Sequence, residues 1–90
     1  MGTFKISWKS SSEQDLKKID KQYILKILDA IESLTGNPFP SQSKKIKSSE
    51  SSYRLRVGDY RVIYQVDSKK KSVIIYYIRH RKDAYKRVKW

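Results

Sequence analysis

Alternating apolar and polar positions predict a β-hairpin in the stretch YRLRVGDYRVIYQV, residues 53–66. Successive side chains of a strand point to opposite faces, so a period of two divides this stretch into two sets. One set is Tyr53, Leu55, Val57, Tyr60, Val62, Tyr64 and Val66, and the other is Arg54, Arg56, Arg61, Ile63 and Gln65. Gly58 and Asp59 predict a two-residue turn between the strands, because glycine readily adopts the positive φ that such turns require.

This hairpin register sets three arginines together on one face. Arg56 lies opposite Arg61, with Arg54 on the diagonal, whereas the two carboxylates of the hairpin, Asp59 and Asp67, are at its ends. Like charges that face each other across two strands destabilise a sheet. A bound anion would relieve this repulsion, because a guanidinium group matches the oxygens of a phosphate. The alternative is a solvated face with the arginines splayed apart.

A helical repeat precedes the hairpin. Apolar residues recur at spacings of three and four, which predicts an amphipathic helical stripe that faces the core: Leu16, Ile19, Tyr23, Ile24, Ile27, Leu28, Ile31 and Leu34. The serines at 10–12 offer an N-cap. A break near Asp20 indicates two helices, with one long helix as the alternative. Gly36 in a left-handed conformation and the prolines of NPFP end the second helix.

Further strands flank these elements. The stretch TFKISW, residues 3–8, alternates like a short strand, and a brief strand is expected at Lys45–Lys47. The run SVIIYYI, residues 72–78, is apolar on both faces, which is typical of a strand covered on both sides. The predicted order is one strand, two helices and then three or four strands, in a single domain over residues 1–90.

Length and composition exclude several classes of protein. The chain has 90 residues, which is enough for one domain. It has no cysteine, which excludes disulfides, Cys-ligated metals and thiol nucleophiles. No apolar run approaches the ~20 residues that span a bilayer, and the N-terminus lacks the apolar stretch of a signal peptide. We therefore expect a cytoplasmic protein with no membrane association.

The positive charge is concentrated in the second half of the chain. The net charge is +12, of which residues 45–90 carry +10. Such a field attracts polyanions and gives sequence-independent affinity for phosphate backbones. Nucleic acid is favoured over an anionic membrane, because the basic residues lie on strand-like segments rather than on an amphipathic helix. An acidic protein partner is compatible with the same surface.

The C-terminal segment RHRKDAY extends this basic character. If residues 72–78 pair beside the hairpin, the segment arrives near the arginines. Tyr85 is then placed to stack on a base, and His80 is the only side chain with an ordinary pKa near neutrality. The candidate RNA-binding residues outside the arginine cluster are Lys45, Lys47, Arg79 and Lys82.

Four segments together resemble the RelE-like toxins of the RelE/ParE superfamily: DLKKIDKQ, NPFP, KKIKSSESSYRLRVGDYRVIYQVD and IRHRKDAYKRV. The resemblance extends from about Phe4 to Val88. It implies an α+β fold in which a twisted antiparallel sheet of about four strands carries two N-terminal helices packed on one face, in the order β-α-α-β-β-β.

The resemblance also implies a function. The protein is expected to be the toxin of a type II toxin–antitoxin pair, a ribosome-dependent endoribonuclease that enters the ribosomal A site and cleaves mRNA there. The reaction requires no metal or other cofactor, and the 2′-hydroxyl attacks the adjacent phosphate. The expected protein partner is a small acidic antitoxin that wraps the basic face. The family's catalytic positions correspond here to Arg54, Arg56, Arg61, Arg81 and Tyr85.

Two departures from the family bear on the mechanism. RelE has lysines at the positions of Arg54 and Arg56, and arginine essentially cannot act as a base. Proton transfer then falls to His80 or Tyr85, or dense positive charge acidifies the 2′-hydroxyl without a dedicated base. The C-terminal helix of RelE is also short or missing here.

Two alternative functions stay open. ParE-like relatives share the fold and inhibit DNA gyrase by protein binding, but they lack the basic residues and the tyrosine. A catalytically degenerate toxin would only bind RNA or its antitoxin, which the arginines at 54 and 56 also allow.

Overall fold

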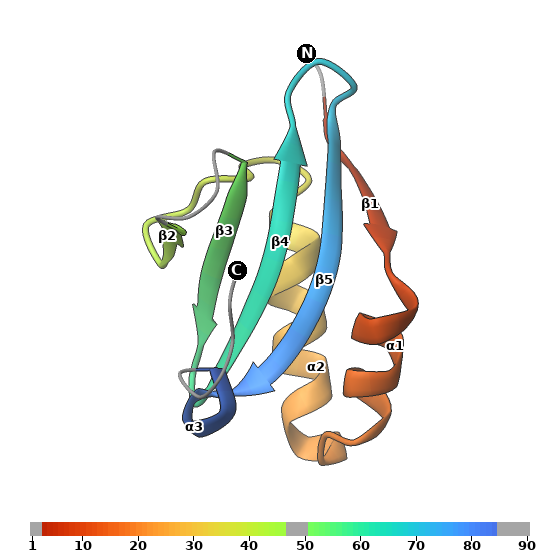
Figure 1. Ribbon diagram of the computed structural model, residues 1–90, viewed down its shortest axis with the longest axis vertical. Helices are drawn as coiled ribbons and strands as arrows, with labels where there is room; N and C mark the ends of the chain where they lie inside the picture. The colour runs from red at the N-terminus through yellow and green to blue at the C-terminus, as the bar shows by residue number, and fades with distance from the viewer. Residues whose placement is uncertain (1–2, 47–50, 85–90) are drawn as a thin grey trace.

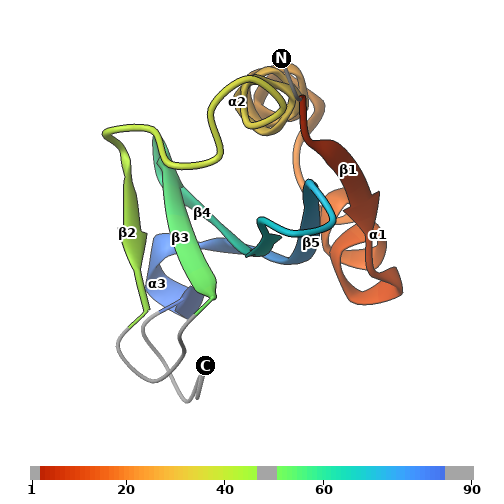
Figure 2. The same cartoon turned by 90° about the horizontal axis from the view of Figure 1, so that it is seen from above.

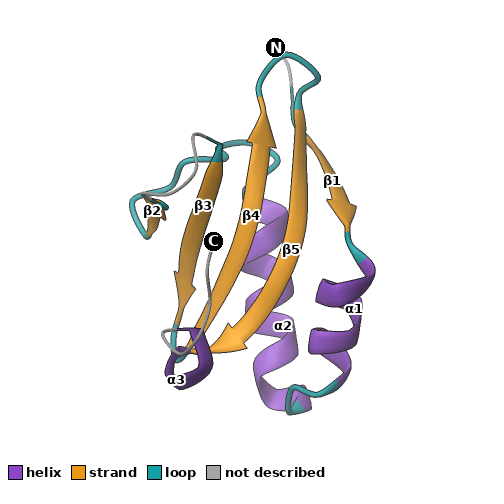
Figure 3. Ribbon diagram, viewed as in Figure 1, coloured by secondary structure: helices purple, strands orange, loops and turns teal. Residues whose placement is uncertain are grey.

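The computed structural model describes residues 3–46 and 51–84. Their elements are β1 (Lys5–Trp8), α1 (Ser10–Lys17), α2 (Lys21–Ser33), β2 (Ser43–Lys45), β3 (Ser52–Val57), β4 (Tyr60–Asp67), β5 (Ser72–His80) and α3 (Arg81–Ala84). The strands form one sheet in the order β1-β5-β4-β3-β2 (Figure 1). Figure 3 shows that α2 covers one face of this sheet, and that α3 is the one described helix at the opposite face.

The predicted α+β class is confirmed, and the sheet differs from the expectation in two details. It has five strands rather than about four, because Ser43–Lys45 forms an edge strand that begins before the predicted Lys45–Lys47. It is also mixed rather than wholly antiparallel, since β1 pairs in parallel with β5. Parallel neighbours require a long crossover, and here both helices and the hairpin lie between the two strands.

The predicted break between two helices is confirmed at Asp20. The Asp20 carboxylate caps α2 by accepting a hydrogen bond from the backbone N–H of Gln22 at 3.3 Å. The expected serine N-cap of the first helix is wrong, because Lys9 occupies that position and makes no side-chain cap. The hydroxyl of Ser12 is instead buried and donates to the Lys9 carbonyl at 2.6 Å. Gly36 is not left-handed either, since Gly58 is the one described glycine with positive φ.

Helix α1 lies at the edge of the sheet beside β5 (Figure 2). β1 ends at Trp8, which pairs with Ile75, so the rest of β5 has no neighbouring strand on that side. Side chains of α1 replace the missing strand there. The Ser11 hydroxyl donates to the Tyr76 carbonyl at 2.6 Å, and the Asp15 carboxylate accepts the N–H of Ile78 at 3.0 Å. This edge therefore keeps its backbone hydrogen bonds without another strand.

The core lies between α2 and the sheet. Its buried members come from α2, from the residues that flank α2, and from β3, β4 and β5: Ile19, Ile27, Ile31, Leu34, Leu55, Val62, Tyr64, Val66, Val73, Ile75 and Ile78. The predicted apolar stripe is thus mostly core, although Tyr23 remains 43% exposed. Tyr64 is fully buried and donates from its hydroxyl to the Pro38 carbonyl at 2.7 Å, which ties the loop after α2 to the sheet.

Candidate functional site

The β3–β4 turn sets the position of the arginines. Val57 pairs with Tyr60 across the turn, and Gly58 has a φ of 58°, so the predicted two-residue turn is confirmed. The predicted register of the hairpin holds over its whole length, and Arg56 pairs with Arg61. The apolar set faces α2 and the core, and the arginines occupy the opposite face.

The sheet extends this pair into a row of three arginines. Arg61 on β4 pairs with Arg56 on one side and with Arg79 of β5 on the other. In the next row, Lys44 of β2 pairs with Arg54 of β3. We call the sheet face that carries these five residues the arginine face.

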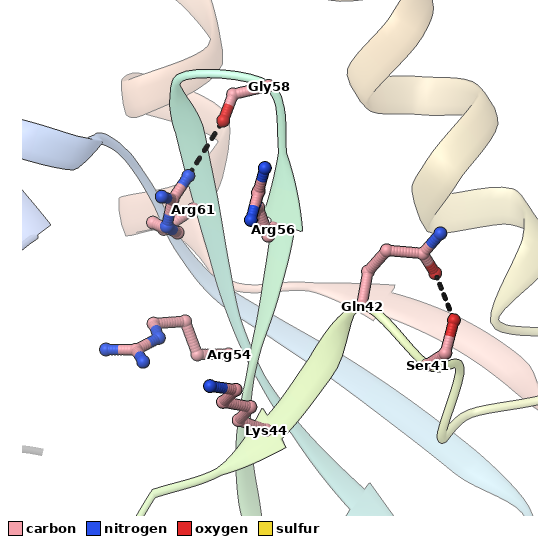
Figure 4. A pocket seen from close by; sticks show the side chains of 7 residues that line it. All are labelled: Ser41, Gln42, Lys44, Arg54, Arg56, Gly58 and Arg61. Carbon is pink, nitrogen blue, oxygen red and sulfur yellow. Dashed lines mark hydrogen bonds between the residues drawn. The ribbon is translucent and has the colours of Figure 1, made fainter.

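A hollow of about 620 Å³ opens on the arginine face, at the β2 side of the hairpin. Figure 4 shows Lys44, Arg54, Arg56 and Arg61 around it, from three different strands. The remaining lining residues are Ser41, Gln42 and Gly58, so no acidic residue is among the described residues that line it. Four cations around one hollow, with no acidic residue among the described residues that line it, favour an anionic ligand.

Arg61 is the most enclosed cation of the group. Only 9% of its surface is exposed, and its Nη1 donates to the carbonyl oxygen of Gly58 (Figure 4) and to that of Tyr60, each at 2.9 Å. These bonds fix the guanidinium group against the turn. Arg56 beside it is exposed and makes no ion pair with the described residues. Arg61 therefore has a structural role in addition to its place in the hollow.

Arg81 lies beside the turn and outside the hollow. It is the first residue of α3, and its backbone N–H donates to the Asp59 carbonyl at 2.6 Å. Its Nε is 3.8 Å from the Asp59 carboxylate, and both side chains are more than half exposed. The structure thus brings Arg54, Arg56 and Arg61 together, with Arg81 at the turn end of the cluster.

His80 lies on the other side of the sheet from the hollow. It pairs with Tyr60, and the two rings meet edge to face with centroids 5.4 Å apart. Its Nδ1 accepts the N–H of Lys82 at 3.3 Å. Burial, followed by the charges of Tyr23, Asp20 and Asp59, raises the pKa of Tyr60 above 10.0. Because the rings of His80 and Tyr60 both lie on the other side of the sheet, neither is positioned to take a proton in the hollow.

The predicted RNA-binding lysines divide between locations. Lys45 pairs with Tyr53, whose ring packs against the core, so alternation places Lys45 away from the arginine face. Lys44 lines the hollow instead, and the sequence reasoning missed it. An antiparallel pairing of residues 43–45 with the first strand of the hairpin would have placed Lys44 opposite Arg54 and so indicated its role. Lys82 is exposed on α3. Lys47 and Tyr85 lie outside the described residues.

Two further features of the described residues concern metals and membranes. No group of three or more His, Asp or Glu side chains in residues 3–46 and 51–84 is arranged to hold a metal ion. Over the same residues, no helix is long and apolar enough to cross a membrane.

Comparison with known proteins identifies relatives of this chain. Residues 6–85 match the family model described as "ParE toxin of type II toxin-antitoxin system, parDE". The curated protein "Putative toxin RelE1" of Methanocaldococcus jannaschii is 37% identical over 76 residues, which are 81% of this chain and 84% of that protein.

Solved structures have the same fold. One is a chain of the archaeal RelE-RelB complex from Pyrococcus horikoshii, with a TM-score of 0.78 and 27% identity over 88% of this chain and 96% of that one. Another comes from the RelB-RelE antitoxin-toxin complex of Methanococcus jannaschii. Its TM-score is 0.75 and its identity 25%, over 92% of this chain and 99% of that one.

Proposed function

Since this chain belongs to the family of type II toxin–antitoxin toxins that the ParE model describes, we propose that it is a ribosome-dependent endoribonuclease that cleaves mRNA and so inhibits translation. The observation that carries this proposal is the hollow on the arginine face. Lys44, Arg54, Arg56 and Arg61 surround it with positive charge, and no acidic residue is among the described residues that line it.

The proposed reaction is a phosphoryl transfer within the RNA chain. The 2′-oxygen forms a bond to the adjacent phosphorus while the bond from phosphorus to the 5′-oxygen breaks, which leaves a 2′,3′-cyclic phosphate and a 5′-hydroxyl. The 2′-hydroxyl releases its proton to solvent, and the leaving 5′-oxygen takes one up. Positive charge stabilises the extra charge of the pentacoordinate phosphate, an electrostatic effect that often dominates catalysis.

Each cation has a proposed role in this reaction. Arg54 and Arg61 hold the scissile phosphate, and Arg56 lies near the 2′-hydroxyl, where its charge favours loss of the proton. Arg81, at the turn end of the cluster, neutralises the leaving 5′-oxygen, and Tyr85 stacks on a neighbouring base. Lys44 adds a phosphate contact from β2.

The position of His80 on the other side of the sheet bears on which group removes the proton from the 2′-hydroxyl. It favours acidification of the hydroxyl by positive charge over a histidine base.

The proposed partners follow from the same surface. The solved relatives are RelE-RelB complexes, so we propose that a cognate antitoxin, small and acidic, binds this chain and covers the arginine face. The proposed target is mRNA in the ribosomal A site, because a translating ribosome presents single-stranded RNA to a compact basic protein.

Inhibition of DNA gyrase is a second candidate, because the matching family model is named after ParE. Expression of the wild-type chain in growing cells separates the two functions. Primer extension is expected to show mRNA cut at codons, with plasmid supercoiling and chromosomal DNA intact. Broken DNA and relaxed plasmids with intact mRNA would overturn the ribonuclease proposal. A protein that binds RNA without either effect would be the degenerate toxin.

A further inference from the structure

The backbone and the side chain of Arg79 belong to different surroundings. Its Cα is in register with Arg61, in the row of three arginines across β3, β4 and β5. Its side chain does not line the hollow of about 620 Å³. It lines a second hollow of about 360 Å³, together with Asp15, Lys18, Tyr60 and His80. Something therefore draws this guanidinium group away from its row.

The Asp15 carboxylate of α1 makes the contact that holds the Arg79 guanidinium group away from the row. Its Oδ2 accepts the Nε–H of Arg79 at 3.1 Å and the backbone N–H of Ile78 at 3.0 Å. The Asp15 side chain is 12% exposed and that of Arg79 is 35% exposed. The ring of Tyr77 lies under the guanidinium group, with the Arg79 Cζ 4.8 Å from the ring centroid. The carboxylate thus closes the β5 edge and neutralises one arginine of the row.

The ion pair between Arg79 and Asp15 holds the guanidinium group in the free protein, and it is weak enough for a phosphate to replace the carboxylate. An ion pair with a partner one-third exposed is screened by water and contributes little to stability. A phosphate oxygen offers the same guanidinium group an equivalent acceptor. The row already carries Arg56 and Arg61, so an anion bound there draws Arg79 back toward it.

We propose that Asp15 is a positioning residue that holds Arg79 aside from the arginine row, and that RNA phosphate competes with its carboxylate for that guanidinium group. This inference rests on the proposed RNA-cleaving function. Contact between RNA and Arg79 releases one counterion from the RNA but exposes a carboxylate that takes one up. Asp15 therefore lowers both the RNA affinity and the salt dependence of binding.

The salt dependence of binding to a short single-stranded RNA tests this role. Asp15→Asn keeps an oxygen for the Ile78 N–H and removes the charge. The slope of log K against log salt is expected to steepen by about 0.7, the value for one phosphate contact on a single strand, with tighter binding at low salt. In an Arg79→Ala background the same substitution is expected to change nothing. Ser11→Ala, the matched control, removes another α1–β5 hydrogen bond without a charge and should leave the slope unchanged.

An NMR measurement on the wild-type protein tests the same inference without relying on the folding of any variant. The NMR signal of the Arg79 Nε–H is expected to shift when the RNA is added, because the carboxylate is replaced by phosphate. If the wild type binds RNA and neither this signal nor the Asp15→Asn slope changes, the inference is wrong and the proposed function stands. If the wild type fails to bind this RNA, the inference is wrong, whereas the proposed ribosome-dependent function is tested separately by cleavage of translated mRNA.

Discussion

Arg56 and Arg61 face each other across the hairpin, yet their surroundings differ. Arg61 is nearly buried and donates to the carbonyls of Gly58 and Tyr60, whereas Arg56 is exposed. Loss of activity in an Arg61 variant would therefore mix catalysis with folding. Arg56 gives the cleaner test of the chemistry of the hollow.

Arg61→Ala is expected to lower the free energy of unfolding by roughly 2 kcal/mol, because hydrogen bonds from a charged donor to two turn carbonyls are lost. Urea denaturation followed by circular dichroism measures this change. Arg56→Ala is the matched control and is expected to stay within about 0.5 kcal/mol of the wild type, since it is an exposed site. Equal stability of the two variants would contradict the structural role of Arg61.

Tyr64 predicts an alkaline limit to stability. Burial, as the largest cause, raises its pKa above 10.0 in the folded protein. A group whose pKa is raised by folding contributes stability below its unfolded pKa, and this contribution is lost as pH rises through the folded value. The free energy of unfolding is therefore expected to fall above pH 10.

Tyr64→Phe isolates this residue from the other tyrosines. It is expected to cost about 1 kcal/mol at pH 7, because the hydrogen bond to the Pro38 carbonyl is lost, and to flatten the decline above pH 10. Unfolding measured from pH 7 to 11 tests both. A decline as steep as in the wild type would show that Tyr64 is not its source.

At the scale of elements, local patterns were sufficient where the pairing is local. Alternation and a glycine turn predicted the β3–β4 register, because a two-residue turn leaves one way to align the strands. The parallel pairing of β1 with β5 spans most of the chain and has no local signal. The three-residue strand β2 is too short for a periodic pattern, which is why Lys44 was missed.

The surroundings of Arg79 and His80 could not be predicted from the sequence, because they also depend on pairing and packing between distant segments. The β4–β5 pairing shifts register between Ile63 and Tyr64. Such an irregularity changes which face each later side chain occupies, and nothing in SVIIYYIRH indicates it. His80 was therefore expected near the arginines although it faces Tyr60, and the contact of Arg79 with Asp15 depends on the packing of α1.

The turn between β3 and β4 gives a prediction at this scale. Gly58→Ala is expected to lower stability by about 1–2 kcal/mol, since a side chain at φ 58° is strained even though space surrounds it. It should also lower RNA cleavage, because the turn holds the Arg61 guanidinium group. Gly36→Ala is the control, with no positive φ and room for a methyl group. Thermal unfolding compares the two, and equal midpoints would contradict the account.

At the scale of the whole molecule, α2 and the cluster of cations lie on opposite faces of the sheet. α2 covers one face of the sheet (Figure 3), and the opposite face, the arginine face, carries the cations that line the hollow (Figure 4). The net charge of +12 resides mostly in the half of the sequence that builds this face. The molecule thus offers a single basic surface to a polyanion. The proposed RNA and the proposed antitoxin compete for this surface.

The most direct test of the central claim is the chemistry of the cut ends. Purified wild-type protein with translating ribosomes and mRNA is expected to yield a 2′,3′-cyclic phosphate and a 5′-hydroxyl. Arg56→Ala is expected to cleave about 10²–10³-fold more slowly, and Lys69→Ala, in the exposed turn after β4, at the wild-type rate. Products with 5′-phosphate ends, or an Arg56→Ala variant as fast as the wild type, would contradict the account.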